Sequence, residues 1–177
     1  QKYGDDRLTK IVAAEGEFEV EDLIKEEQTV ISLTHFGYIK RMPVDTYKSQ
    51  KRGGKGITGM TTREDDFVKQ IFTASTHDTI LFFSNKGKMY RLRGYEIPEA
   101  GRTAKGTAIV NLLNVEAGEK ISAIMPIQNF EDGKFVTMAT KNGLIKKTAL
   151  KEYDSSRKTG LLGINLKEDD ELIDVRL

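Results

Sequence analysis

Residues 79–92 read TILFFSNKGKMYRL, and this stretch decides the fold of the chain. The run Thr79–Ser84 is apolar and β-branched and is bounded by a polar segment, which predicts a buried strand. Gly87 permits the positive φ that a tight turn needs, and the apolar residues of Met89–Leu92 then return. The stretch therefore predicts an antiparallel β-hairpin.

The same hairpin pattern occurs three times along the chain. The other two copies are residues 29–42, which turn at Gly37, and residues 135–148, which turn at the Asn142-Gly143 pair. Each hairpin is followed at similar spacing by a second glycine, a further apolar segment, a turn rich in acidic residues or glycine, and a closing strand. We expect the further strands at 57–60, 109–112 and 164–166, and the closing strands around the apolar pairs Val68/Ile71, Ile121/Ile124 and Leu172/Val175. The acidic turns at 64–66 and 168–171 are expected to be solvated.

Three units of about 50 residues with four strands each predict an all-β fold of propeller-like blades. The predicted units are 29–78, 79–133 and 134–177. Residues 1–28 form an acidic connector, with a short strand near 8–12 and a helical turn at 22–25. A sandwich or barrel is the alternative, and the absence of tryptophan argues against an ordinary WD40 propeller. Three blades are fewer than a closed ring has and Gln1 is no natural start, so we expect a piece of a longer protein.

Charge follows the repeat, although the whole chain carries a net charge of only +1. Residues 30–63, 80–106 and 134–160 carry net charges of +6, +4 and +5, whereas 64–79, 107–133 and 161–177 carry −3 each. Equivalent positions of successive blades lie at equivalent places around a propeller. The basic halves are therefore predicted to form a stripe of the kind that a nucleic-acid backbone binds.

The most basic segment is the loop QKRGGKG at residues 50–56, with three cations and three glycines. Weaker versions occur at 101–106 and 155–160. A solvated basic turn is the alternative interpretation of any one of them. Residues 54–59 match G-x-G-x-x-G, but no strand precedes them and no helix follows, so a dinucleotide site is not favoured.

Several classes of site are not predicted. The chain has no cysteine and only two histidines, His35 and His77, neither with acids at a repeated ligand spacing, so we expect no metal site and no catalytic pair. The tyrosines mostly occupy positions typical of a core. The lack of cysteine, signal peptide and membrane-spanning run predicts a cytoplasmic protein without a membrane partner.

The loop at 50–56 resembles the GyrA box, the signature of the A subunit of bacterial DNA gyrase, and the seven-residue pattern is intact. Other segments also resemble that family: 3–11 its cleavage-core tail, 21–24 the link to its C-terminal domain, and 109–113, 138–147 and 170–173 that domain itself. The resemblance covers essentially all 177 residues.

The resemblance implies half of a six-bladed β-pinwheel, a propeller whose blades exchange strands. Its basic rim would wrap double-stranded DNA, so that the ATP-dependent type II topoisomerase introduces negative supercoils. The fragment itself would be non-catalytic and without cofactor, because ATP and Mg²⁺ act elsewhere in the A2B2 assembly with the gyrase B subunit.

The DNA-binding residues implied for the box are Gln50, Lys51, Arg52, Gly53, Gly54, Lys55 and Gly56. Those predicted for the rim are Lys40, Arg41, Lys48, Lys86, Lys88, Arg91, Arg93, Arg102, Lys105, Lys146, Lys147, Arg157 and Lys158. The equivalent domain of topoisomerase IV, whose box is degraded, and a propeller-like protein-interaction scaffold are the alternatives.

Overall fold

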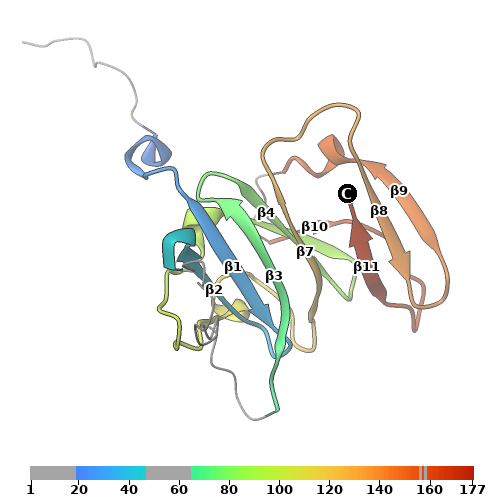
Figure 1. The fold of residues 1–177 in the computed structure, drawn as a ribbon. Helices are drawn as coiled ribbons and strands as arrows, with labels where there is room; N and C mark the ends of the chain where they lie inside the picture. Colours follow the sequence, from blue (N-terminus) through green and yellow to red (C-terminus); the bar gives the residue numbers. More distant parts are fainter. Residues whose placement is uncertain (1–18, 47–64, 156, 158) are drawn as a thin grey trace, which may run out of the picture.

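The computed structural model describes residues 19–46, 65–155, 157 and 159–177, which form three antiparallel sheets (Figure 1). The first sheet has the strand order β3-β1-β2-β6 and the second β10-β5-β4-β7, while three strands are described in the third, in the order β11-β8-β9. The all-β prediction is confirmed, and the described part of the chain contains short 3-10 helices but no α-helix. None of its helices is long and apolar enough to cross a membrane.

The bounds of the elements follow the chain. The strands are β1 Gln28–Thr34, β2 Tyr38–Pro43, β3 Val68–Ser75, β4 Thr79–Ser84, β5 Lys88–Arg93, β6 Thr107–Ala108, β7 Ile121–Ile127, β8 Phe135–Thr140, β9 Ile145–Ala149, β10 Leu161–Leu162 and β11 Leu172–Arg176. The 3-10 helices are η1 Val20–Leu23, η2 Val44–Thr46, η3 Gly94–Glu96, η4 Ile109–Asn111 and η5 Leu150–Tyr153.

The three predicted hairpins are present as β1–β2, β4–β5 and β8–β9. Their turn glycines, Gly37, Gly87 and Gly143, have φ of 86°, 80° and 85°, which residues with a Cβ rarely adopt. All six residues of β4 are buried because this strand is central in a sheet that is covered on both faces. The prediction of a buried strand at 79–84 is therefore confirmed.

The predicted strands at 109–112 and 164–166 are wrong in place and in length. Two short strands occur instead just after Gly106 and Gly160, and each pairs with the hairpin of the preceding unit, β6 with β2 and β10 with β5. The backbone N–H groups of Ile109 and Ile164 then donate to the carbonyls of the turn glycines Gly37 and Gly87, at 2.8 and 3.2 Å. These bonds end the strand pairing, so 109–111 turn into η4. The strands expected at 8–12 and 57–60 lie outside the described residues.

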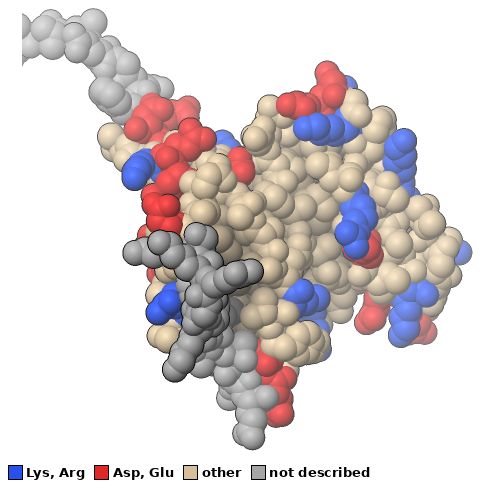
Figure 2. Space-filling model, in the orientation of Figure 1, with Lys and Arg blue, Asp and Glu red and all other residues tan. Residues whose placement is uncertain are grey.

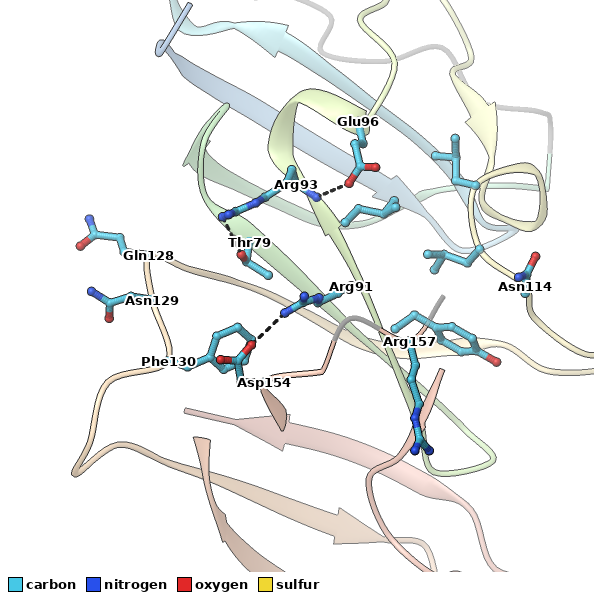
Figure 3. Close-up of a pocket in the computed structure, with 14 residues that line it drawn as sticks. Thr79, Arg91, Arg93, Glu96, Asn114, Gln128, Asn129, Phe130, Asp154 and Arg157 are labelled. Carbon is cyan, nitrogen blue, oxygen red and sulfur yellow. Dashed lines mark hydrogen bonds and ion pairs between the residues drawn. The ribbon is translucent and has the colours of Figure 1, made fainter. Parts of the chain in front are cut away.

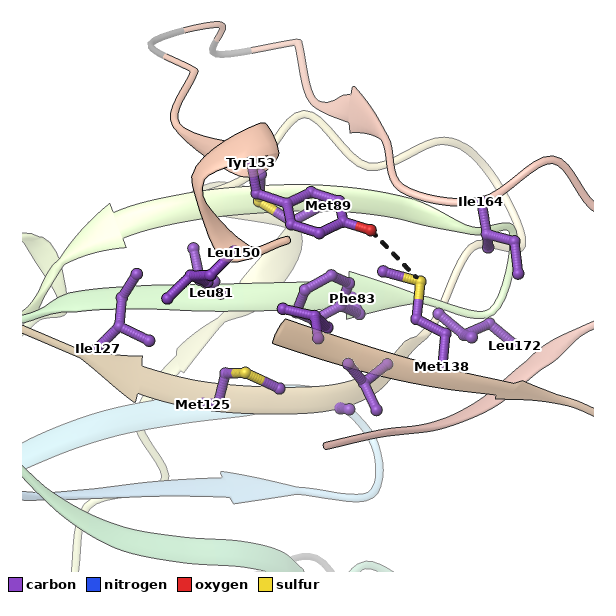
Figure 4. Close-up of a cluster of buried hydrophobic side chains, with 13 residues drawn as sticks. Leu81, Phe83, Met89, Met125, Ile127, Met138, Leu150, Tyr153, Ile164 and Leu172 are labelled. Atoms are coloured by element: carbon purple, nitrogen blue, oxygen red, sulfur yellow. Dashed lines mark hydrogen bonds between the residues drawn. The ribbon is translucent and has the colours of Figure 1, made fainter. Parts of the chain in front are cut away.

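Two apolar cores join the three sheets. Alternate residues of β4 face opposite sides: Ile80 and Phe82 pack towards the first sheet, and Leu81 and Phe83 towards the third. Figure 4 shows the second of these clusters, in which side chains of β4, β5 and β7 meet Met138, Leu150 and Tyr153 of the last unit. The sheets are thus stacked like blades and not closed into separate domains.

The closing strands β3, β7 and β11 are neighbours across the stack. Lys69 Nζ and Gln70 Nε2 of β3 donate to the carbonyls of Ile121 and Ile124 of β7, at 2.8 and 2.7 Å. Ser122 Oγ of β7 donates to the carbonyl of Leu172 of β11 at 2.8 Å. In the first two sheets the exchanged strands β6 and β10 form the opposite edge, which we call the outer edge.

The acidic connector docks on the turn between β3 and β4. Its helical turn is η1 at Val20–Leu23, two residues earlier than predicted. His77 Nε2 lies 2.8 Å from the carbonyl of Ile24, and Thr76 Oγ1 donates to the carbonyl of Lys25 at 2.9 Å. His77 therefore has a structural contact that helps hold the connector.

Candidate nucleic-acid interface

A cation occupies the same place in each of the three hairpins. Arg41 of β2, Arg91 of β5 and Lys147 of β9 each lie four residues after the turn glycine. All three strands lie towards the outer edge, so the fold repeats one positive charge per sheet along that edge. This regular spacing was predicted from the repeat.

Acidic residues of the following unit pair with two of these cations. Arg41 Nη1 lies 3.3 Å from Glu99 Oε2, and its Nε donates to the carbonyl of Ile97 at 2.7 Å. Arg91 Nη1 lies 3.1 Å from Asp154 Oδ1. The carboxylates are about half exposed, at 54% and 60% of their side-chain surface. The carboxylate side of each pair is therefore open to solvent, where a phosphate can compete for the arginine.

The cations of the second hairpin turn are paired as well. Lys86 and Lys88 both contact the carboxylate of Glu116, the former at 3.5 Å. The hydrogen bond from Lys88 lowers the pKa of Glu116, and the same bond raises the pKa of Lys88. Arg93 contacts Glu21 of the connector at 3.2 Å. These predicted rim residues are therefore each paired with a nearby acid.

Four other predicted rim cations have no ion pair with a described residue: Arg102, Lys105, Lys146 and Arg157. Lys105 Nζ lies 3.9 Å above the ring of Tyr38, and Lys146 Nζ donates to the carbonyl of Gly163 at 3.0 Å. Lys147 lies over the ring of Phe135 at 4.2 Å. The box at 50–56, Lys48 and Lys158 lie outside the described residues.

Lys40 does not belong to the rim, and its prediction as a DNA contact is wrong. Its relative exposure is 0%, and its ammonium donates to the carbonyls of Gly101, Arg102 and Ala104. The sequence shows two adjacent cations, Lys40 and Arg41, but neighbouring side chains of a strand point to opposite faces. Only the second of them reaches the surface side of β2.

A polar pocket of about 680 Å³ opens beside β5 (Figure 3). Arg91, Arg93 and Arg157 line it together with the amides of Asn114, Gln128 and Asn129. In Figure 3 the Arg91 side chain reaches the Asp154 carboxylate, beside Phe130, over whose ring its guanidinium lies at 5.8 Å. The pocket is therefore lined by polar groups of two successive units.

Charge on the visible face is mixed (Figure 2). Acidic side chains gather around η1, and Lys and Arg side chains are spaced over the rest of this face, several beside an acid. The basic halves of the sequence thus place cations at repeated positions, with carboxylates interleaved among them.

Sequence reasoning missed two buried carboxylates in turns that were expected to be solvated. Asp66 Oδ1 accepts from the backbone N–H groups of Phe36 and Phe67, at 3.0 and 2.9 Å, and so ties the first hairpin turn to β3. Asp170 makes the same pair of bonds to Asn142 and Glu171, both at 2.9 Å. The signal was their shared place, two residues before the closing strand. Glu119 holds that place in the second unit but accepts from the Tyr90 hydroxyl.

The geometry defines a class of protein: a β-propeller whose antiparallel blades exchange their outer strands. The profile of the family described as DNA gyrase C-terminal domain, beta-propeller, matches residues 28–75, 78–128 and 134–177. The chain belongs to this family, and the resemblance stated from the sequence is confirmed.

Curated relatives cover the whole chain. It is 58% identical over 176 residues to the DNA gyrase A protein of Clostridium acetobutylicum, a match that covers 99% of this chain and 21% of the relative. It is 57% identical over 177 residues to the DNA gyrase A protein of Halalkalibacterium halodurans, again with 21% of the relative covered. The chain therefore spans about a fifth of the length of these relatives.

Solved structures share the fold. The C-terminal domain of DNA topoisomerase IV superposes with a TM-score of 0.74 at 30% identity, over 86% of this chain and 46% of that one. A DNA gyrase A C-terminal domain superposes with a TM-score of 0.65 at 28% identity, over 84% of this chain and 47% of that one.

Proposed function

We propose that this chain binds duplex DNA along its outer edge and bends it, as a non-catalytic part of a gyrase A protein. The observation that carries the proposal is the repeated cation of Arg41, Arg91 and Lys147 on the second strand of each successive hairpin. Cations at regular steps neutralise phosphates whatever the base sequence, so such an edge positions the duplex without reading it.

The ion pairs with the following unit prepare these cations for exchange. Glu99 and Asp154 contact the guanidinium groups of Arg41 and Arg91, whose side chains are 15% and 30% exposed. A phosphate that takes their place keeps the charge-assisted hydrogen bonds and releases condensed counterions. Bending a duplex over tens of base pairs costs on the order of 1–10 kcal/mol, so contacts from several blades are needed to offset it.

The rest of the proposal concerns the longer protein. The box residues 50–56 would add phosphate contacts or join the first blade to the remainder of the ring. ATP-dependent negative supercoiling, a cytoplasmic location and assembly with the gyrase B subunit would follow from the identity of the full-length relatives. The identities of 57–58% to gyrase A proteins favour gyrase over topoisomerase IV as the enzyme concerned.

The test is binding of a short duplex by the chain over a range of salt concentrations. The logarithm of the binding constant should fall with the logarithm of salt at about 0.9 per phosphate neutralised, with little preference among sequences of equal bendability. A flat salt response would refute the proposal and favour a protein-interaction scaffold. In the full-length protein, alanine at Lys51, Arg52 and Lys55 together should abolish negative supercoiling while ATP-independent relaxation persists.

A further inference from the structure

Lys40 is buried, and no acidic residue in the described part of the chain pairs with it. Its relative exposure is 0%, and its Nζ lies 2.9, 2.9 and 3.0 Å from the carbonyl oxygens of Gly101, Arg102 and Ala104. An ammonium carries three protons, so this set of acceptors satisfies all of them. Burial lowers the pKa of Lys40, and the three carbonyl dipoles hold the charged form in place. A buried lysine is costly unless its hydrogen bonds are complete, and here all three donors of the ammonium have an acceptor.

The three carbonyls belong to one loop, which comes from the next unit and leads into the exchanged strand β6. Other backbone bonds to this loop are Ala100 to the carbonyl of Arg41, at 3.2 Å, and Ala104 to that of Gly101, at 3.1 Å. A Cβ at Gly101 would meet nothing within 4 Å, so packing does not fix that position. The Lys40 ammonium is therefore the point on which the loop backbone converges.

The same loop carries two of the rim cations that have no described ion pair. Arg102 is exposed and gives its own carbonyl to Lys40, so the bond fixes the backbone from which its side chain extends. Lys105 follows directly after Ala104 and lies 3.9 Å over the Tyr38 ring. A buried charge thus organises two surface charges.

The equivalent position in the second unit supports this arrangement. Tyr90 takes the place of Lys40 in the second hairpin and packs against the incoming loop of the third unit, where a Cβ at Gly160 would lie 2.7 Å from its ring. One place in the hairpin thus holds the loop of the next unit in both cases, by packing in the second and by three hydrogen bonds in the first.

We propose that Lys40 is a positioning residue for DNA: it shapes the loop 101–105 so that Arg102 and Lys105 face the same stretch of phosphate backbone. This inference rests on the proposed DNA binding, and it assigns Lys40 no contact with DNA of its own. Each phosphate contact raises the affinity roughly fivefold at about 0.15 M salt. The two contacts together raise it about 30-fold and add about 1.8 to the steepness with which log affinity falls against log salt.

The experiment measures duplex affinity against salt for the full chain and five variants. Lys40→Met keeps the buried stem and removes the three donors, and Lys40→Gln restores an amide that can bond two of the carbonyls. Lys25→Met is the control, because it removes one positive charge from an exposed residue outside the rim. Arg102→Ala/Lys105→Ala removes the positioned pair itself, and is also combined with Lys40→Met.

We expect Lys40→Met to lower the salt slope by more than one and the affinity by about five- to 30-fold, with Lys40→Gln intermediate and Lys25→Met within about twofold of the parent. Adding Lys40→Met to the Arg102/Lys105 double variant should cost nothing more. If Lys40→Met does not fold, the salt slope and affinity of Lys40→Gln relative to the parent chain test the inference by themselves.

Two results would overturn the inference while leaving DNA binding intact. The first is that Lys40→Met, or Lys40→Gln where Lys40→Met does not fold, keeps the salt slope of the parent. The second is that the affinity loss of Lys40→Met and that of the Arg102/Lys105 double variant multiply fully when the substitutions are combined. Absence of salt-dependent binding by the parent chain would instead refute the proposed function, so the two failures are distinguishable.

Discussion

Gly106 is a residue at which strand exchange depends on the absence of a side chain. Its φ is 93°, and a Cβ there would lie 2.6 Å from the carbonyl oxygen of Ile39, the backbone with which β6 pairs. For Gly106→Ala the left-handed conformation costs about 1–2 kcal/mol. The carbonyl of Ile39 must also retreat, which disrupts the two-residue ladder at about 1 kcal/mol per hydrogen bond. The total is about 3–4 kcal/mol.

Gly133→Ala is the matched control. Gly133 has a φ of 84°, yet a Cβ there would meet nothing within 4 Å, so only the conformational cost of about 1–2 kcal/mol applies. Urea titration of both variants gives the free energies of unfolding. A difference of about 2 kcal/mol in favour of Gly133→Ala is expected from the lost ladder bonds. Equal destabilisation would refute the idea that close approach to β2 selects glycine at 106.

Four further predictions follow from particular contacts. Burial raises the pKa of Asp66, but hydrogen bonds from Thr34, Phe36 and Phe67 outweigh this effect, so the net pKa is lowered. The carboxylate therefore contributes stability above the ordinary pKa of 3.8, and this stability is lost as the pH falls through the folded pKa. On going to acid pH, the urea midpoint of the Asp66→Asn variant should fall less than the midpoints of the parent and of the exposed control variant Asp65→Asn. Tyr90→Phe should cost about 1–2 kcal/mol in urea unfolding, because the buried carboxylate of Glu119 loses the Tyr90 hydroxyl and keeps only the backbone N–H of Glu116 as a donor; no change would show that the hydroxyl bond contributes nothing to stability. Asp154→Asn and Glu99→Gln should each raise duplex affinity by up to roughly fivefold at low salt by releasing Arg91 and Arg41, and unchanged titrations would contradict the exchange of carboxylate for phosphate. Ile145 of β9 is 76% exposed, whereas the equivalent residues Ile39 and Met89 of the other hairpins are buried. This exposed residue should drive self-association, so Ile145→Lys should lower the apparent mass in light scattering at high concentration.

The sequence alone determined the hairpins. Runs such as Thr79–Ser84 and the turn glycines 37, 87 and 143 encode local conformation, because burial on both faces and positive φ leave their mark within a few residues. The repeated cations at Arg41, Arg91 and Lys147 could likewise be read from spacing, since the repeat places equivalent residues at equivalent sites.

Only the tertiary structure decided which hairpin each later segment joins. The sequence places Thr107–Ala108 in the second unit, but the strand completes the first sheet, because pairing depends on what lies opposite in space. The same cause separates two adjacent cations: Arg41 stays at the surface, whereas Lys40 is enclosed by a loop more than 60 positions away. A charge can be buried only where polar groups hydrogen-bond to it, and for Lys40 these groups are backbone carbonyls of the neighbouring unit.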